Sequence, residues 1–141
     1  MKRILVGVDG SNESRNAARL AEEIARATGS QLIIASAVPP VIPTEVAPEL
    51  VVQLEQWWRK EHDQANAIVK KAASSIGPGI VVETMVIDGA PAVALAEFAR
   101  AGDVELVVVG HRGRNAVARA LLGSVADRLV QISPKPVLVA R

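Results

Sequence analysis

Apolar residues fall into two patterns that alternate along the chain. Short runs rich in Val, Ile and Leu have the length of buried strands, and longer segments repeat apolar residues every three or four positions, as amphipathic helices do. This alternation predicts a single α/β domain over residues 1–141, with a doubly wound parallel sheet, right-handed crossovers and helices on both faces. The predicted strands cover residues 3–9, 31–38, 80–87, 106–109 and 136–140.

The helical pattern fills the intervals between these strands. A turn and N-cap at Gly10-Ser11-Asn12 precede the first helix, and Gly29 ends it. The second helix is long, and its adjacent Trp57 and Trp58 point about 100° apart, so one of them is expected at the edge of the apolar stripe or in a subunit contact. This second helix is predicted over residues 49–76. A third helix is predicted to begin near Pro91 and end near Gly102, and a last one to begin at Ser124.

The segment between residues 39 and 48 has no periodicity and contains four prolines. It is longer than the usual connection of about 2–6 residues in α/β units. Two interpretations stay open: a surface connector, or a flap over a pocket.

Composition narrows the class of protein. Apolar residues make up 50% of the 141 residues, with one Phe, two Trp and no Tyr, which suits a Val, Ile, Leu and Ala core between a parallel sheet and alanine-rich helices. A net charge of +1 without long charged runs argues against nucleic-acid and membrane-surface partners. The absence of cysteine excludes disulfides and thiolate chemistry. No apolar run approaches the roughly 20 residues of a membrane span, so a soluble, cytoplasmic protein is expected.

The chemistry-bearing stretch lies after the fourth strand, where Gly110, Gly113 and Gly123-Ser124 frame a loop and a helix start. A phosphate group needs backbone N–H donors without Cβ atoms in the way, and the first turn of a helix adds further donors and a positive dipole end. Arg112 and Arg114 make the loop locally cationic in a nearly neutral chain. The stretch therefore predicts a site for a polyphosphate.

The glycine spacing, with two residues between the first pair and nine before Gly123-Ser124, is similar to the signature of the universal stress protein family in its ATP-binding branch. The opening residues 1–11 and the closing segment 134–139 resemble that family as well. The resemblance implies the strand order 3-2-1-4-5, which brings Asp9 opposite Gly110 at the point where the winding reverses. Ligands of such sheets bind at that point, outside the carboxyl ends of the strands.

The resemblance also implies roles for individual residues. Asp9 is expected near the ribose and phosphates, the backbone around Ala37 and Val38 at the adenine edge, and Gly7 beside the base, where many relatives carry a larger residue. The ligand would be ATP, with Mg²⁺ held through its phosphates rather than in a protein metal site. The expected nucleotide-binding residues are Gly7, Val8, Asp9, Ala37, Val38, Val109, Gly110, Arg112, Gly113, Arg114, Gly123, Ser124 and Val125.

Other classes fit less well. The chain has no P-loop motif, and only Gly7 and Gly10 flank Asp9 where a dinucleotide fingerprint would be needed. A receiver-like signalling domain would use Asp88 as the phosphoacceptor, without the paired acids expected near Asp9. His62 and His111 lie far apart in sequence, and no carboxylate pattern accompanies either, so neither indicates a metal site.

Two functions remain from different classes. No evident base or nucleophile is arranged to activate water, so we expect a binding module in which ATP acts as a switch, with slow Mg-dependent ATP hydrolysis as the alternative. The fifth strand would lie at the sheet edge, where unpaired backbone groups invite association. We therefore expect a homodimer formed by antiparallel pairing of Val137, Leu138 and Val139 with their copies.

Overall fold

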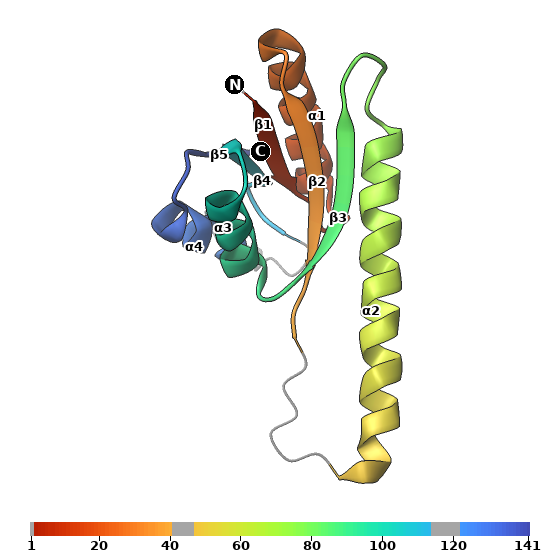
Figure 1. Cartoon of the computed structure of the whole chain (residues 1–141). Helices are drawn as coiled ribbons and strands as arrows, with labels where there is room; N and C mark the ends of the chain where they lie inside the picture. The colour runs from red at the N-terminus through yellow and green to blue at the C-terminus, as the bar shows by residue number, and fades with distance from the viewer. Residues whose placement is uncertain (1, 41–46, 114–121) are drawn as a thin grey trace.

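Five parallel strands form one sheet between two pairs of helices in the computed structural model (Figure 1). The structure describes residues 2–40, 47–113 and 122–141. The strand order is β3-β2-β1-β4-β5, which confirms the predicted doubly wound topology. The elements are β1 Arg3–Gly7, α1 Asn12–Thr28, β2 Gln31–Val38, α2 Pro48–Ser74, β3 Val82–Asp88, α3 Pro91–Ala101, β4 Val104–Gly110, α4 Ser124–Ile132 and β5 Val137–Ala140.

The core is split by the sheet into two apolar layers. Successive side chains of a strand point to opposite faces, so Ile4 and Val6 pack under α1 and α2, whereas Leu5 packs under α3 and α4. Figure 1 shows the two helix pairs on opposite sides of the sheet. Alanine lines the helix faces next to the sheet, four of them on α1 alone, and small side chains let a helix approach the strands closely. Both faces of the sheet are therefore covered by closely packed helices.

Helix α1 has the ends that the sequence predicts. The Ser11 hydroxyl accepts a hydrogen bond from the backbone N–H of Ser14, and Gly29 closes the helix with φ of 69°. Near its C-terminus, Glu22 accepts hydrogen bonds from Arg26 at 2.7 Å and from the backbone N–H of Gly77 at 3.0 Å. These two donors hold the pKa of the Glu22 carboxyl below its usual value.

Several boundaries differ from the prediction. β1 ends at Gly7 rather than Asp9, because the chain turns towards α1 there. α2 ends at Ser74 rather than residue 76, because the N–H groups of Ser75 and Ile76 bond to carbonyls three residues back and tighten the last turn. β3 begins at Val82 instead of residue 80, and β4 begins at Val104, two residues earlier than predicted.

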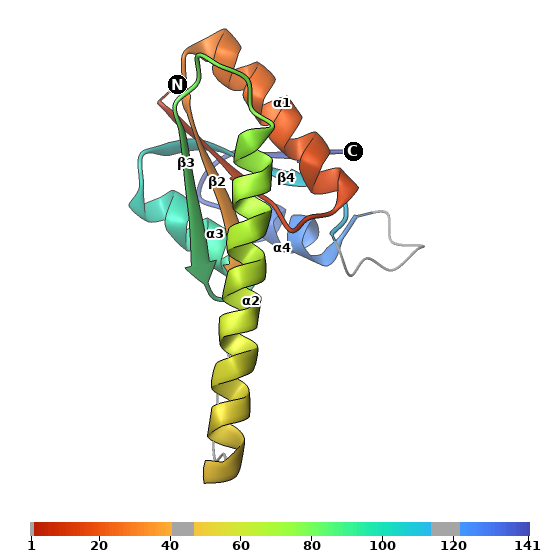
Figure 2. The ribbon, with the colours of Figure 1, turned by 90° about the vertical axis from the view of Figure 1, so that its right-hand side faces the viewer.

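The tryptophans lie in the N-terminal half of α2. Both are exposed, Trp57 to 43% and Trp58 to 40%, and the expectation that one of them lies at the edge of the apolar stripe or in a subunit contact stays a prediction. Their exposure follows from the position of this half of α2, which extends past the end of the sheet (Figure 2).

Two further points concern the chain as a whole. Across the described ranges, none of the helices combines the length and the apolar character needed to cross a bilayer. Most of the proline-rich connection, residues 41–46, lies outside the described residues, so the two interpretations of this segment, a surface connector or a flap, both stay open.

Candidate functional site

A difference in strand length opens a recess at the carboxyl edge of the sheet. β1 is flanked by β2 and β4, yet its register with β2 ends at Gly7, while β2 continues to Val38 and β4 to Gly110. β2 and β4 thus extend beyond the carboxyl end of β1, which lies between them. This is the point where the winding reverses, the usual ligand position in open α/β sheets.

One residue of β2 presents its backbone to this recess. In a parallel pair, alternate residues of a strand bond to its two neighbours. Val8 donates to the carbonyl of Ala35 at 2.9 Å on the β1 side, and Gly89 donates to the carbonyl of Val38 at 2.9 Å beyond β3. Ala37, two residues after Ala35, therefore turns its N–H and C=O towards the space that β1 has left.

Asp9 organises the turn at the end of β1. Its carboxylate accepts a hydrogen bond from the N–H of Ser11 at 2.9 Å, and its own N–H donates to the hydroxyl of Ser14 at 3.3 Å. The Ser14 hydroxyl donates in turn to the carbonyl of Ser11 at 3.0 Å. This network leads the chain from the strand into α1 and holds the Asp9 carboxylate at the wall of the recess.

Glycines bring the loop after β4 close to its neighbours. The N–H of Gly123 donates to the carbonyl of His111 at 2.8 Å, which joins the start of α4 to the end of β4. A Cβ at Gly123 would lie 2.9 Å from the Cα of Arg112, and one at Gly113 would lie 2.7 Å from an Asp9 carboxylate oxygen. Only glycine therefore permits this approach at Gly123, where the obstacle is backbone.

Gly110 and Gly7 serve packing as well. A Cβ at Gly110 would lie 2.8 Å from the carbonyl carbon of Glu13, so this glycine lets α1 begin directly against β4. A Cβ at Gly7 would lie 2.8 Å from a methyl group of Leu95, a side chain that can move. Because Gly7 has no side chain, the Leu95 side chain occupies the space beside it, beneath the recess.

In the described part of the site, the charge of Arg112 is balanced by a nearby acid. Arg112 lies 3.5 Å from Glu13 in the first turn of α1, and both side chains are about a third exposed. Within the described residues, the Nε of Arg112 is buried without a hydrogen-bond partner. The Arg112 guanidinium therefore has donor capacity left for an anion in the recess.

The recess is a cavity of about 550 Å³, within the range of small-molecule sites. The structure brings twelve of the thirteen sequence-predicted residues to its wall, and the thirteenth, Arg114, lies outside the described residues. The twelve are Gly7, Val8, Asp9, Ala37, Val38, Val109, Gly110, Arg112, Gly113, Gly123, Ser124 and Val125.

Sequence reasoning missed other lining residues. Ser14 could have been found from the sequence, because it lies three residues after the N-cap Ser11, within the first helical turn. No local sequence pattern marks Glu61 and Gln64 of α2 as lining residues, since only the tertiary fold places that helix beside the cavity. The remaining missed residues are Ala35, Ser36, Pro39, Ala65, Ile68, Pro91, Leu95, Leu122, Ala126 and Asp127.

Asp88 and the histidines lie elsewhere. Asp88 does not line the cavity but contacts His62 of α2, with 2.7 Å between Oδ1 and Nε2, and the His62 ring packs on Trp58 with centroids 4.0 Å apart. The backbone N–H of His111 donates to the carbonyl of Ala140. In the described part of the chain, no group of three or more His, Asp or Glu side chains is placed to hold a metal ion.

Known proteins resemble this chain along its whole length. It is 34% identical to a universal stress protein of Methanocaldococcus jannaschii, over 99% of this chain and 82% of that one. It is 30% identical to one from Thermus aquaticus, over 99% and 98%. Some mycobacterial relatives are longer: a 39% identical universal stress protein of Mycobacterium tuberculosis matches over only 47% of its length.

Solved structures give the same result. A universal stress protein of Lactobacillus plantarum superposes with a TM-score of 0.84 at 25% identity, over 99% of this chain and 97% of that one. A universal stress protein in complex with cAMP superposes with a TM-score of 0.73 at 33% identity, over the same shares. The family model described as "Universal stress protein family" matches residues 1–141. The chain belongs to the universal stress protein family.

Proposed function

We propose that the cavity binds ATP and that the protein acts as a nucleotide-dependent switch. The observation that carries this proposal is the combination, in one recess, of a backbone edge for a base and a glycine loop for phosphates. Ala37 offers one N–H donor and one C=O acceptor side by side, the pattern needed by the donor and acceptor edge of adenine. The complex of a 33% identical relative with cAMP supports an adenine nucleotide as the ligand class.

The phosphates would lie at the other end of the recess. Gly113, Gly123 and Ser124 surround that end, and α4 begins there with its N–H groups and positive dipole end. Arg112 adds a guanidinium with spare donors. These groups fit a polyphosphate better than an uncharged ligand.

A magnesium ion is compatible with the residues present. Mg²⁺ usually keeps several waters and is bound by one or two carboxylates together with substrate phosphates. Asp9 supplies one carboxylate at the wall of the recess, beside the loop glycine Gly113. Asp9 and the nucleotide phosphates would hold the ion, which would neutralise phosphate charge.

The switch would work by joining elements that are distant in sequence. The cavity wall includes residues from the start of α1, from α2 and from the β4–α4 loop. A ligand that contacts all three draws them together and so changes the surface offered to a partner. ATP left intact after long incubation with Mg²⁺ and protein would support the switch, whereas steady phosphate release would support the slow ATPase.

Calorimetric titration tests the binding itself. Nucleotide-free protein should bind Mg-ATP at micromolar affinity or somewhat weaker, a free energy of about −8 kcal/mol or less in magnitude. Heat-denaturing fresh protein and identifying any released nucleotide by mass spectrometry provides the control for prior occupancy. Proven nucleotide-free protein that gives no saturable heat would contradict the proposal.

The Glu13 carboxylate provides a second, directional test. It lies 3.5 Å from the Arg112 guanidinium and competes with phosphate for the same cation. Glu13→Gln removes that competitor and one negative charge, so Mg-ATP should bind about two- to fivefold more tightly, as expected for a partly exposed ion pair. Arg112→Gln should weaken binding instead. If Glu13→Gln weakens binding as well, the pair orders the site rather than competing with the ligand.

We further propose that β5 forms the homodimer interface. The N–H of Val107 donates to the carbonyl of Pro136, and the N–H of His111 donates to the carbonyl of Ala140. Because bonding direction alternates along a strand, Val137 and Val139 turn their backbone groups away from β4, towards the open edge. Leu138 and Ala140 direct their backbone groups at β4, so of the three residues expected to pair with their copies, Val137 and Val139 offer backbone groups at the open edge and Leu138 does not.

A further inference from the structure

At the end nearest β2, the cavity has one apolar and one polar side. Helix α3 contributes Pro91 and Leu95 to the apolar side. The polar side, under α2, consists of Ser36 from β2 and of Glu61 and Gln64 from α2 itself. This is the end where Ala37 is proposed to contact the base. The polar side groups therefore border the part of a nucleotide that distinguishes one base from another.

Ser36 places a buried hydroxyl on the polar side. Strand residues alternate between the two faces of a sheet, so Ser36 points the same way as Ile34, which packs in the layer under α1 and α2. Ser36 is only 5% exposed, and its hydroxyl has no hydrogen-bond partner among the described residues. Burying a hydroxyl without a partner costs free energy. A polar ligand atom in the cavity would supply the missing partner.

Glu61 belongs to the face of α2 that borders the cavity. Residues 61, 64, 65 and 68 all line the cavity, and their spacing of three or four positions places them on one side of the helix. Glu61 is half-buried there, whereas the nearby Lys60 and Asp63 are exposed. Within the described ranges, the Glu61 carboxylate forms no hydrogen bond or ion pair. Both of its oxygens can therefore accept hydrogen bonds from a ligand.

A contact next to Glu61 holds this part of α2 at the end of β2. The Nε2 atom of His62 lies 2.7 Å from Oδ1 of Asp88, and Asp88 is the register partner of Val38. Val38 directly follows Ala37 on β2. Glu61 is thus level with the strand end where the base is proposed to bind, while the phosphate loop lies on the other side of β1.

Adenine has more hydrogen-bonding groups than Ala37 alone can pair. Its N6 amino group carries two hydrogens, and its ring nitrogens N1 and N7 are acceptors. The N–H and C=O of Ala37 would pair with N1 and with one N6 hydrogen, so the second N6 hydrogen needs another acceptor. The Glu61 carboxylate is an acceptor without a donor of its own, and the Ser36 hydroxyl and the Gln64 amide can donate to a ring nitrogen.

We propose that Glu61 determines the base specificity of the cavity by accepting the second N6 hydrogen of adenine. This inference rests on the proposed ATP site and adds the feature by which the base is selected. Two acceptors, the Ala37 carbonyl and the Glu61 carboxylate, then face one amino group. A 6-oxo purine sets a third acceptor against both and leaves them unpaired, so the cavity rejects it.

N6-methyl-ATP tests this contact directly, because it keeps one N6 hydrogen and loses the other. Calorimetric titration of wild type and Glu61→Ala with the magnesium complexes of ATP and N6-methyl-ATP forms a double-mutant cycle. Methylation should weaken binding to wild type about tenfold and binding to Glu61→Ala less than about twofold. Any effect of the methyl group on the free nucleotide is common to both proteins and cancels. Equal effects of methylation in the two proteins would overturn the proposal.

The sign of the charge effect gives an independent test. Loss of a negative charge near the cavity should by itself strengthen binding of an anionic nucleotide. Glu61→Ala should instead weaken Mg-ATP binding about tenfold, because a hydrogen bond to a charged group is lost. Glu61→Gln, whose amide oxygen still accepts, should keep most of the affinity. Tighter or unchanged binding by Glu61→Ala would contradict the assigned role.

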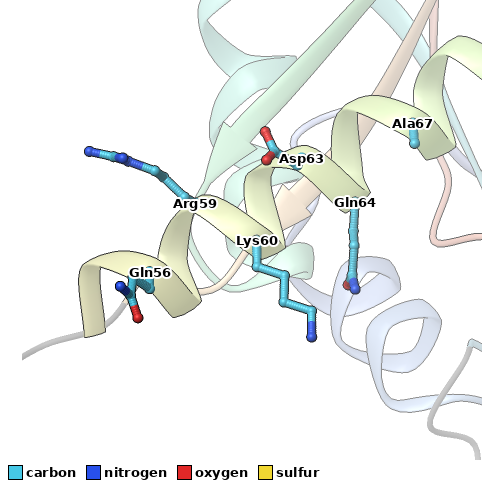
Figure 3. Close-up of a pocket in the computed structure, with 6 residues that line it drawn as sticks. All are labelled: Gln56, Arg59, Lys60, Asp63, Gln64 and Ala67. Atoms are coloured by element: carbon cyan, nitrogen blue, oxygen red, sulfur yellow. The ribbon is translucent and has the colours of Figure 1, made fainter. Parts of the chain in front are cut away.

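Asp63→Ala is the matched control on the same helix. Figure 3 shows Asp63 in an open hollow of about 520 Å³ on α2, whose described lining residues all belong to that helix. Asp63 does not line the nucleotide cavity. Its loss removes the same charge as Glu61→Ala, yet Mg-ATP should bind at least as tightly as to wild type. A tenfold loss in Asp63→Ala as well would mean that the helix, and not the Glu61 carboxylate, is responsible.

Other bases separate this inference from the proposed function. Wild type should prefer Mg-ATP over Mg-ITP, which carries a 6-oxo group, by at least about a hundredfold. Equal binding of the two would overturn the role of Glu61, and so would tighter binding of Mg-GTP than of Mg-ATP. These outcomes leave the nucleotide site itself in place. If nucleotide-free wild type binds no Mg-ATP, the proposed function and this inference both fail.

Discussion

Gly123→Val is expected to weaken Mg-ATP binding at least about a hundredfold, close to 3 kcal/mol. A Cβ at this position would lie 2.9 Å from the Cα of Arg112 and 3.2 Å from the carbonyl oxygen of His111. Both obstacles are backbone, so the loop itself must move away, and with it the N–H groups proposed to hold the phosphates. Gly113→Val should act in the same direction through the Asp9 carboxylate, an obstacle that can shift.

The measurement is calorimetric titration of each variant, with circular dichroism and thermal unfolding to establish that the fold persists. Gly102→Ala is the control, since that glycine lies after α3, has no positive φ and does not line the cavity. Wild-type affinity in folded Gly123→Val protein would mean that the glycine serves the turn alone and that the phosphates bind elsewhere.

Val139→Pro is expected to convert the proposed dimer into a monomer. Val139 turns its N–H away from β4, towards the open edge of the sheet, so proline there removes a donor of the subunit contact without breaking the β4 ladder. The proline ring also obstructs the approach of a second strand. The molecular mass measured by light scattering coupled to size exclusion should fall from that of two 14.8 kDa chains to that of one.

Val139→Ala is the matched variant, because it loses similar packing against the α3 and α4 layer but keeps the N–H. It should remain a dimer or dissociate only weakly. A wild-type monomer at tens of micromolar would refute β5 pairing, and a dimer that survives Val139→Pro would show that the contact lies on another surface.

The architecture follows from the sequence because its signals are local. Strand runs, the Ser11 cap and the Gly29 stop each depend on a few neighbouring residues, and all three are confirmed. The end of β1 does not follow in this way. An apolar run continues to Val8, but β1 ends at Gly7, and the N–H and carboxylate of Asp9 bond to Ser14 and Ser11 at the start of α1.

The same distinction holds for the candidate site. The glycine loop is contiguous enough to be recognised, and the structure places its described part at the cavity. Glu61 and Gln64 could not be predicted, because their arrival at the cavity depends on how α2 crosses the sheet edge, a long-range packing outcome. That both Trp57 and Trp58 are exposed could not be predicted for a related reason: periodicity gives the direction of a helix face but not how far the opposing sheet extends.

The early end of β1 has a consequence for how such a site evolves. If Ala37 contacts the base through its N–H and C=O, every residue except proline carries the same two groups at that position. Selection on base recognition would then constrain side-chain size there but leave residue identity free to drift. Relatives could keep one ligand class while their aligned residues at this point diverge, and a change of specificity could arise from a shift in where β1 ends rather than from any substitution at the contact.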